Sequence, residues 1–342
     1  MKNIVWRISG TSVQGLHHID KNIPCQDKIF SLKNEADGIT AIALADGAGS
    51  AAMSHYGADK AVKVICEKLC ENFNKIINFD DPGAAGDFLI KAILTQLDIL
   101  SQELNCKLES LASTLLAAAS DGENILLAHL GDGVIGCFKD GKIIPASLPE
   151  NGEFKNETFF TTSPYAERRI RLIKDKIAGI SGIVLMSDGA ADVLYNSQNK
   201  KFAALLDEIK KNCLIYSAED NNIALDNLFN NIKYKTHDDC SMIIMCRPDE
   251  YFRGYRDLDE NAQNYFLGAK NLAGKENREK IFSILAQADG EALSSSVIIK
   301  SACKLGLKRR QASGLIKDLC KNGFIEYVKI FPRKRYKLKF LY

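Results

Sequence analysis

Four short apolar runs in this chain each adjoin an aspartate, and this recurrence limits the folds that the chain can adopt. The aspartates are Asp46 after ITAIALA, Asp132 after NILLAHLG, Asp188 after GIVLMS, and Asp238 before DCSMIIM. Each run is short and rich in aliphatic residues, which is typical of a buried strand. A carboxylate at the end of a buried strand needs a partner there, because burying an unpaired charge is costly.

Two interpretations of these aspartates compete. An Asp-Gly pair at a strand end is usually a turn, and Gly47, Gly133 and Gly189 follow three of the four aspartates. Alternatively, carboxylates from separate strands share one centre, since a cluster of hard oxygen ligands suits Mg²⁺ or Mn²⁺. Taken singly, each pair favours a turn, whereas the ordered set favours a metal site.

The composition is that of an ordinary globular protein, with 342 residues, 46% hydrophobic and 26% charged. No run of 18 apolar residues occurs, and the N-terminus lacks the apolar segment of a secretory signal, so we expect neither a membrane span nor secretion. The ten cysteines form no Cys-x-x-Cys pairs and predict reduced thiols, with no zinc site and no disulfide framework. These features predict a cytoplasmic protein.

Charge is unevenly distributed along the chain. Residues 255–342 hold 18 Lys and Arg against 9 Asp and Glu, a net charge of +9, whereas the whole chain carries +2. This asymmetry predicts two modules with different partners. We expect a first domain at 1–250, a linker with a helix of its own at 251–274, and a second domain at 275–342.

The first domain lacks a regular alternation of strands and helices. Strands are expected in 1–45, helices from about 54 and over about 85–104, and strands again from 113 to 144. A loop-rich segment with a short helix near 166–176 precedes the buried strand that ends at Asp188. Two helices, near 200–212 and 219–233, then lead to a last strand over 240–247. This order argues for antiparallel sheets with helices outside them.

The second domain has a different pattern. Three short helices are expected at 277–288, 294–306 and 309–323, followed by a hairpin over 324–342, which is a winged helix-turn-helix arrangement. Basic residues mark the start of its third helix and the hairpin tip: Lys308, Arg309, Arg310, Arg333, Lys334 and Arg335. They favour contacts with nucleic-acid phosphates, although such modules also serve as protein contacts.

Six motifs occur in order: QD at 26–27, DGAGS at 46–50, STLL at 113–116, GDG at 131–133, SDGAADVL at 187–194 and DDCS at 238–241. With them, residues 1–247 resemble the metal-dependent protein phosphatases of type 2C, in particular a bacterial branch. The resemblance implies an α+β fold, a four-layer α-β-β-α sandwich of two antiparallel sheets. It also implies a site for two or three Mn²⁺ or Mg²⁺ ions at one edge of the sandwich.

The resemblance implies a role for each matching residue. Asp46 should bridge two metals, the carbonyl of Gly47 should bind one of them, and Asp188 and Asp238 should hold the other. Asp132 matches the position associated with a third, weaker metal.

Residues near the first motif complete the implied site. Asp27 should orient water at the metals, and Gln26, where the family often has Glu, should reach a metal through water. The family also often has an arginine at position 22 that grips phosphate, and this chain has Asn22. His17 or His18 is the expected substitute.

The implied activity is hydrolysis of phosphoserine and phosphothreonine in substrates of a Ser/Thr kinase, hence signal transduction. The resemblance implies attack by a hydroxide that bridges the metals, with the C-terminal module serving for targeting or regulation. A second hypothesis is a winged-helix regulator that binds nucleic acid or protein and whose phosphatase-like domain is a sensor with little turnover. Gln26 and Asn22 keep this second hypothesis open.

Overall fold

The computed structural model describes residues 6–149, 158–247, 255, 258–269, 271–288, 291–330 and 333–338. The chain divides into two compact units. The large unit comprises Ile8–Ile209 and Ala218–Met245, and the small unit comprises Met1–Arg7, Lys210–Ser217 and Cys246–Tyr342. The small unit therefore includes segments that lie far from its C-terminal part in the sequence, so the boundaries at 250 and 275 stay a prediction.

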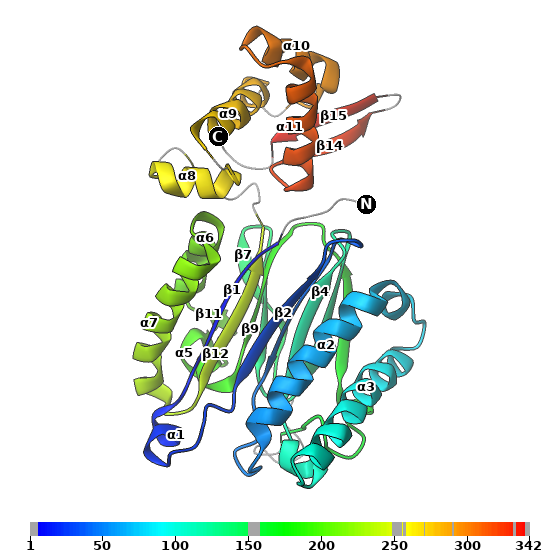
Figure 1. Ribbon diagram of the computed structural model, residues 1–342, viewed down its shortest axis with the longest axis vertical. Helices are drawn as coiled ribbons and strands as arrows, with labels where there is room; N and C mark the ends of the chain where they lie inside the picture. The colour runs from blue at the N-terminus through cyan, green and yellow to red at the C-terminus, as the bar shows by residue number, and fades with distance from the viewer. Residues whose placement is uncertain are drawn as a thin grey trace. The chain divides into compact units, whose positions relative to one another are not determined.

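Two five-stranded sheets form the centre of the large unit (Figure 1). In the first sheet, the strand order is β1 (Arg7–Val13), β12 (Cys240–Cys246), β9 (Ile180–Met186), β6 (Val134–Lys139) and β7 (Lys142–Ser147). In the second sheet, it is β2 (Lys28–Asn34), β3 (Ile39–Ala45), β4 (Leu115–Ser120), β5 (Asn124–Leu130) and β8 (Arg171–Lys176). Both sheets are antiparallel, as the sequence predicts.

Helices cover the outer faces of the two sheets (Figure 1). On the second sheet lie α2 (Ser54–Ile77) and α3 (Pro82–Glu103), with the 3₁₀ turn η1 (Leu108–Leu111) and the short α4 (Ala166–Arg169) beside them. On the first sheet lie α5 (Asp188–Leu194) and α7 (Ala218–Thr236). The remaining elements with residues in the large unit are α1 (Leu16–Asp20), α6 (Leu205–Ile215) and the paired β10 (Tyr195–Asn196) and β11 (Lys201–Phe202).

Strand β3 shows why the apolar runs are continuous. All seven of its residues are buried. Ala41, Ala43 and Ala45 face the core under α2 and α3, whereas Ile42 and Leu44, fully buried, point to the opposite face of the sheet. A strand that is covered on both faces needs apolar side chains at every position, so alternation with polar residues is lost.

The segment after the predicted loop differs from the sequence-based expectation. The predicted helix near 166–176 ends at Arg169, and Arg171–Lys176 forms β8, which pairs antiparallel with β5. Backbone pairing along the free edge of β5 outweighs the weak helical pattern here. Helix α6 also starts later than predicted, at Leu205, because Lys201–Phe202 pairs with Tyr195–Asn196.

The C-terminal part of the small unit contains the predicted three helices and hairpin in order. They are α9 (Leu272–Ala286), α10 (Ser295–Lys304), α11 (Arg309–Lys321), and the strands β14 (Ile325–Ile330) and β15 (Arg333–Leu338). A two-residue strand, β13 (Leu293–Ser294), adds a third strand beside β15. Helix α8 (Glu260–Leu267) lies within the predicted linker. In the described part of the chain, no helix is both long enough and apolar enough to cross a membrane.

Contacts of Arg7 explain in part why segments far apart in the sequence belong to the same small unit. Its guanidinium donates hydrogen bonds to the carbonyl oxygens of Tyr265, at 2.9 Å, and Phe266, at 2.6 Å, and to that of Leu214. It also stacks over the Tyr265 ring, 4.4 Å from the ring centroid. The N-terminal segment is thus held to α8 by a largely buried cation.

Candidate metal centre

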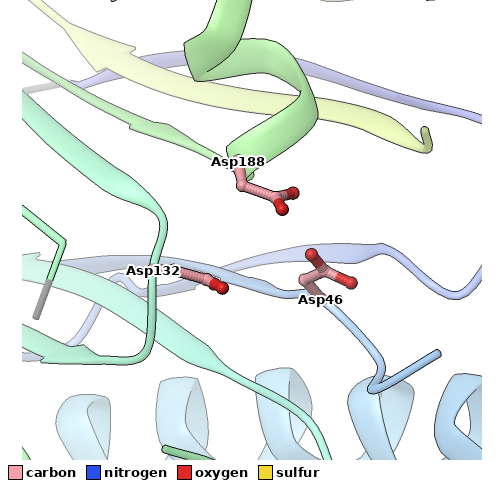
Figure 2. A group of neighbouring side chains, drawn as sticks. All are labelled: Asp46, Asp132 and Asp188. Carbon is pink, nitrogen blue, oxygen red and sulfur yellow. The ribbon is translucent and has the colours of Figure 1, made fainter. Parts of the chain in front are cut away.

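Three aspartates from separate elements converge in the large unit (Figure 2). Asp46 directly follows β3, Asp132 lies between β5 and β6, and Asp188 is the first residue of α5. One carboxylate oxygen from each lies within 4.8 Å of the other two. The predicted meeting of Asp46, Asp132 and Asp188 is therefore present in the structure.

The glycines after these aspartates are not explained by turn conformation. The backbone φ angle is not positive at Gly47, Gly133 or Gly189. A Cβ on Gly47 would lie 2.8 Å from the Ser54 side chain, one on Gly133 would lie 2.7 Å from the Met186 carbonyl oxygen, and one on Gly189 would overlap the Asp239 carbonyl oxygen. The glycines thus allow close approach of neighbouring segments around the aspartates, which supports the site interpretation over the turn interpretation.

A cavity of about 380 Å³ opens at this cluster. Its lining includes the three aspartates, Gln26, Gly47 and Asp238, together with His17, His18, Lys21, Ile23, Ala48, Gly49, Thr114 and Phe160. Asp238 is exposed and lies outside the group of three carboxylates within 4.8 Å. The structure thus brings Asp238 to the rim of the same cavity and not into the closest carboxylate cluster.

Like charges dominate the electrostatics of the cluster. Burial, and then the charges of Asp27, Asp188 and Asp132, raise the pKa of Asp46 well above its usual range. Burial, and then Asp132 and Asp238, raise the pKa of Asp188 to about 6. Two hydrogen bonds reach these carboxylates in the described part of the chain: Thr158 donates to Asp132 Oδ2 at 2.7 Å, and Gly189 N donates to Asp188 Oδ1 at 2.6 Å. A divalent cation would remove this repulsion, and hard oxygen donors are the ligands it prefers.

Asp27 and Gln26 leave oxygen atoms without partners beside the cluster. Asp27 is only 1% exposed, and burial followed by the charge of Asp239 raises its pKa to about 7. Neither of its carboxylate oxygens has a hydrogen bond of ordinary geometry within the described ranges. Gln26 donates from Nε2 to Ser54 Oγ at 2.7 Å, while its buried Oε1 has no such partner among the described residues. These orphaned oxygens fit a site that binds a cation or ordered water.

The residues expected to grip phosphate lie in different surroundings. His17 is exposed at the cavity rim, whereas His18 is buried with its Nδ1 2.9 Å from Asp239 Oδ1. Asn22 is exposed in a left-handed turn, with φ of 55°, and does not line the cavity. Its neighbour Lys21 does line the cavity. Among the described residues that line the cavity, Lys21 is the only lysine or arginine.

Two residues of this region were missed by sequence reasoning. Lys21 is not predicted because the resemblance places the phosphate-binding cation at position 22, one residue further along. Asp239 was overlooked because it follows Asp238 directly, and successive residues normally point to opposite sides. The Asp238-Asp239 doublet was the available signal for a second, buried carboxylate.

The basic residues of the small unit are partly described. Lys308, Arg309 and Arg310 are exposed at the start of α11. Lys334 and Arg335 are exposed on β15, whereas the side chain of Arg333 lies outside the described residues. The described basic side chains are therefore accessible to a partner.

The chain belongs to the protein phosphatase 2C family, whose model matches residues 14–228, more than half of the chain. A serine/threonine-protein phosphatase 3 from Escherichia coli K12 is 27% identical over 172 residues, which cover 48% of this chain and 66% of that protein. The chain thus spans slightly less than two thirds of this relative.

A solved structure with a TM-score above 0.5 supports the fold. The structure of a Caenorhabditis elegans sex-determining protein superposes with a TM-score of 0.52 at 15% identity, covering 77% of this chain and 67% of that one. The catalytic domain of the serine/threonine phosphatase PstP, in complex with two manganese ions, has a TM-score of 0.46 at 16% identity, covering 71% of this chain and 98% of that one.

Proposed function

We propose that this chain is a metal-dependent phosphatase that hydrolyses phosphoserine and phosphothreonine in proteins. The observation that carries the proposal is the convergence of Asp46, Asp132 and Asp188 within 4.8 Å at an open cavity. Three carboxylates held this close repel one another unless a cation lies between them. Family membership over residues 14–228 supports the same activity.

Two or three Mn²⁺ or Mg²⁺ ions would be held by Asp46, Asp188 and the Gly47 carbonyl, with Asp132 and Asp238 as further ligands. When bound, such ions lower the pKa of water and offset the negative charge that develops on the transferring phosphoryl group. Gln26 would offer its free Oε1 as an uncharged acceptor. Because an amide adds no negative charge to offset that of a metal ion, we expect Gln26 to contact the metal through water.

The other residues of the cavity bind and orient the reactants. Asp27, with both oxygens free of ordinary hydrogen bonds, is suited to accept a proton from the attacking water and to fix its direction. Lys21 brings a cationic side chain to the cavity, where it would bind phosphate in place of the expected arginine at position 22. The open cavity suits an extended phosphopeptide better than a buried small molecule.

The test is phosphate release from a phosphothreonine peptide with Mn²⁺, with Mg²⁺ and with EDTA. We expect turnover that requires either metal and that falls by at least about 100-fold in Asp46→Asn. Circular dichroism would establish that the variant is folded. Absence of turnover by folded wild type with every metal would contradict the proposal and favour the sensor hypothesis.

We further propose that the C-terminal part of the small unit is a winged-helix-like module that targets the enzyme to a polyanionic partner. Its support is the exposed basic set at the start of α11 and on β15, namely Lys308, Arg309, Arg310, Lys334 and Arg335. Duplex DNA and an acidic protein remain the two candidates. Duplex binding that weakens with salt, and that weakens further in Arg309→Ala, would identify nucleic acid. No binding up to millimolar DNA at low salt would leave the acidic protein.

A further inference from the structure

His129 is a fully buried histidine that has no part in the proposed metal set. It lies in β5, and its side chain is 0% exposed. Leu126, Ala128 and Leu130 of the same strand pack into the core beneath α2 and α3, so His129 points from the opposite face of the strand, toward the first sheet. A polar ring in this apolar interior needs hydrogen-bond partners, because burial without them is costly.

Both ring nitrogens of His129 have a partner. Nδ1 lies 2.8 Å from Oγ of Ser147, the last residue of β7, and Nε2 lies 3.1 Å from the carbonyl oxygen of Gly131. A carbonyl oxygen can only accept a hydrogen bond, so Nε2 carries the hydrogen and donates it, and Nδ1 accepts from the Ser147 hydroxyl. His129 therefore joins the first sheet, through Ser147, to the segment that leads from β5 to Asp132.

The surroundings of His129 keep its ring uncharged. Burial, and then the charge of Arg171, lower the pKa of His129 to about 3. Arg171 lies opposite His129 in the pairing of β5 with β8. A neutral imidazole has one donor and one acceptor nitrogen, and these match the Gly131 carbonyl and the Ser147 hydroxyl. The two hydrogen bonds are thus satisfied together by the neutral ring.

The carbonyl that His129 holds controls where Asp132 begins. The Gly131 carbonyl and the Asp132 nitrogen belong to one planar peptide unit, so fixing the Gly131 oxygen fixes the plane that contains the Asp132 Cα. Gly131 has a φ of 109°, and a Cβ on it would lie 2.6 Å from the Thr114 side chain. Because glycine has access to more backbone conformations than other residues, contacts such as the one with His129 are needed to hold Gly131 in this one.

A second contact holds the carboxylate of Asp132. Thr158 donates to Asp132 Oδ2 at 2.7 Å, and the Asp132 side chain extends toward Asp46 (Figure 2). One Asp132 oxygen lies within 4.8 Å of an oxygen from Asp46 and of one from Asp188. A metal ligand must lie within about 0.2 Å of its ideal distance. A shift of the Asp132 backbone would therefore weaken the binding of an ion that this carboxylate holds.

We propose that His129 is a positioning residue for the metal centre, and that its hydrogen bond from Nε2 to the Gly131 carbonyl places the Asp132 carboxylate for a divalent ion. This inference rests on the proposed metal-dependent phosphatase function. His129 acts only through Asp132 and touches neither the ion nor the substrate. Loss of such a supporting contact weakens metal binding by about 10- to 100-fold, whereas ions held by other carboxylates keep their affinity.

The test is Mn²⁺ binding to the full-length chain, measured by isothermal titration calorimetry without turnover. The ion that is lost in Asp132→Asn identifies the site that this carboxylate holds. We expect His129→Asn, whose amide is too short to reach Gly131, to weaken the binding of this ion by about 10-fold or more, and that of other ions by less than about 3-fold. His129→Gln places an amide nitrogen near the position of the imidazole Nε2, so it should restore the affinity to within about 3-fold of wild type.

Two further variants separate positioning from packing. Ser147→Ala removes the partner of Nδ1 in the same buried cluster and leaves the bond from Nε2, so the affinity of the Asp132 ion should stay within about 3-fold of wild type. In an Asp132→Asn background, His129→Asn should leave the affinities of the remaining ions within about 3-fold, because the carboxylate that it positions is gone. Equal weakening of every ion in His129→Asn, or an equal effect of Ser147→Ala, would overturn the positioning role and indicate a general loss of packing.

The same titrations distinguish this role from the metal centre itself. If wild type binds Mn²⁺ and Asp132→Asn loses an ion, but His129→Asn binds as wild type does, the positioning role fails and the metal centre stands. If Asp132→Asn keeps every ion, Asp132 is not a ligand and His129 has nothing to position. If wild type binds no Mn²⁺, the metal centre is overturned, and the role of His129 with it.

NMR of the wild-type protein tests the hydrogen bond directly. The chain has five histidines, so ¹⁵N-histidine spectra of the metal-free protein are tractable, and the signal that is lost in His129→Gln identifies His129. We expect a neutral ring with the hydrogen on Nε2 and a lone pair on Nδ1. A hydrogen on Nδ1 would contradict the bond to Gly131 and overturn the positioning role.

Discussion

Asp27 illustrates how individual residues in the centre are set by like charge and burial. It is almost fully buried, it faces Asp239 and Asp188, and the hydroxyls of Ser241 and Ser187 offset only part of the resulting rise in its pKa. A carboxyl group in such surroundings holds its proton in the folded state far more tightly than in the unfolded chain. The stability of the metal-free protein should therefore depend on pH in a direction opposite to that of an ion-paired carboxylate.

The first prediction concerns that dependence. The pKa of Asp27 is about 7 in the folded protein, against an ordinary 3.8. Its contribution to stability is complete below pH 3.8 and is lost as pH rises through about 7, since the unfolded chain ionises first. In EDTA, wild type should therefore lose more free energy of unfolding between pH 5 and pH 8 than Asp27→Asn. Urea unfolding measures this difference, and equal losses would show that Asp27 is not held protonated.

The second prediction concerns Lys21. Replacing it with alanine removes the cation that we assign to the substrate phosphate, so the KM for a phosphopeptide should rise about 3- to 10-fold, with a smaller effect for Lys21→Arg. Lys63→Ala is the control, because Lys63 lies on α2 and pairs with Asp59 away from the cavity. An unchanged KM in Lys21→Ala would remove Lys21 from the site.

At the scale of elements, the third prediction tests the packing of α2 against η1. A Cβ on Gly57 would overlap the Leu111 carbonyl oxygen, which is backbone and unable to move aside. Gly57→Ala should therefore destabilise the protein by about 2 kcal/mol or more, despite the better helix propensity of alanine. Gly314 in α11 has nothing within 4 Å of such a Cβ, so Gly314→Ala should stabilise by about 0.5–1 kcal/mol. Chemical denaturation distinguishes the two, and a stabilising Gly57→Ala would show that the contact is not tight.

Elements also differ in how well the sequence predicts them. Strands β3 and β9 are buried along their whole length, so an unbroken apolar run identifies them. Strand β8 contains Arg171, Lys174 and Lys176 and depends on its neighbour β5 for pairing, so local sequence does not reveal it. Helix α5 was missed because its seven residues form only two turns after a buried strand.

Residues of the candidate site also differ in how well the sequence predicts them. Asp46, Asp132 and Asp188 were predictable because each stands at the end of a recognisable strand. Asp239 and His18 were not predictable as a pair, since their contact joins positions 221 residues apart through the backbone of Gly15 and Gln26. Contacts of this kind depend on tertiary packing and leave no periodic pattern in the sequence.

At the scale of the whole molecule, the two compact units should respond to different perturbations. The aspartate cluster belongs entirely to the large unit, whereas Arg7 and its partners Leu214, Tyr265 and Phe266 belong to the small unit. A ligand stabilises only the unit that binds it in the folded state.

The fourth prediction follows for calorimetry of the intact chain. Mn²⁺ should raise the Tm of the transition that belongs to the large unit, and Arg7→Gln should lower that of the small unit by removing about 2 kcal/mol of charge-assisted hydrogen bonding. If Arg7→Gln abolished the Mn²⁺ shift, the two units would not be energetically separate.

The central claim is that the converging aspartates form a metal centre that drives phosphate ester hydrolysis. The most direct test is a Mn²⁺ titration in which bound metal and phosphate release from a phosphothreonine peptide are measured on the same samples. For wild type and for Asp87→Asn, on the exposed face of α3, turnover should rise with bound Mn²⁺ and vanish in EDTA. Asp188→Asn should lose at least one bound ion and about 100-fold or more of the turnover. Turnover that persists in EDTA or in Asp188→Asn would contradict the account.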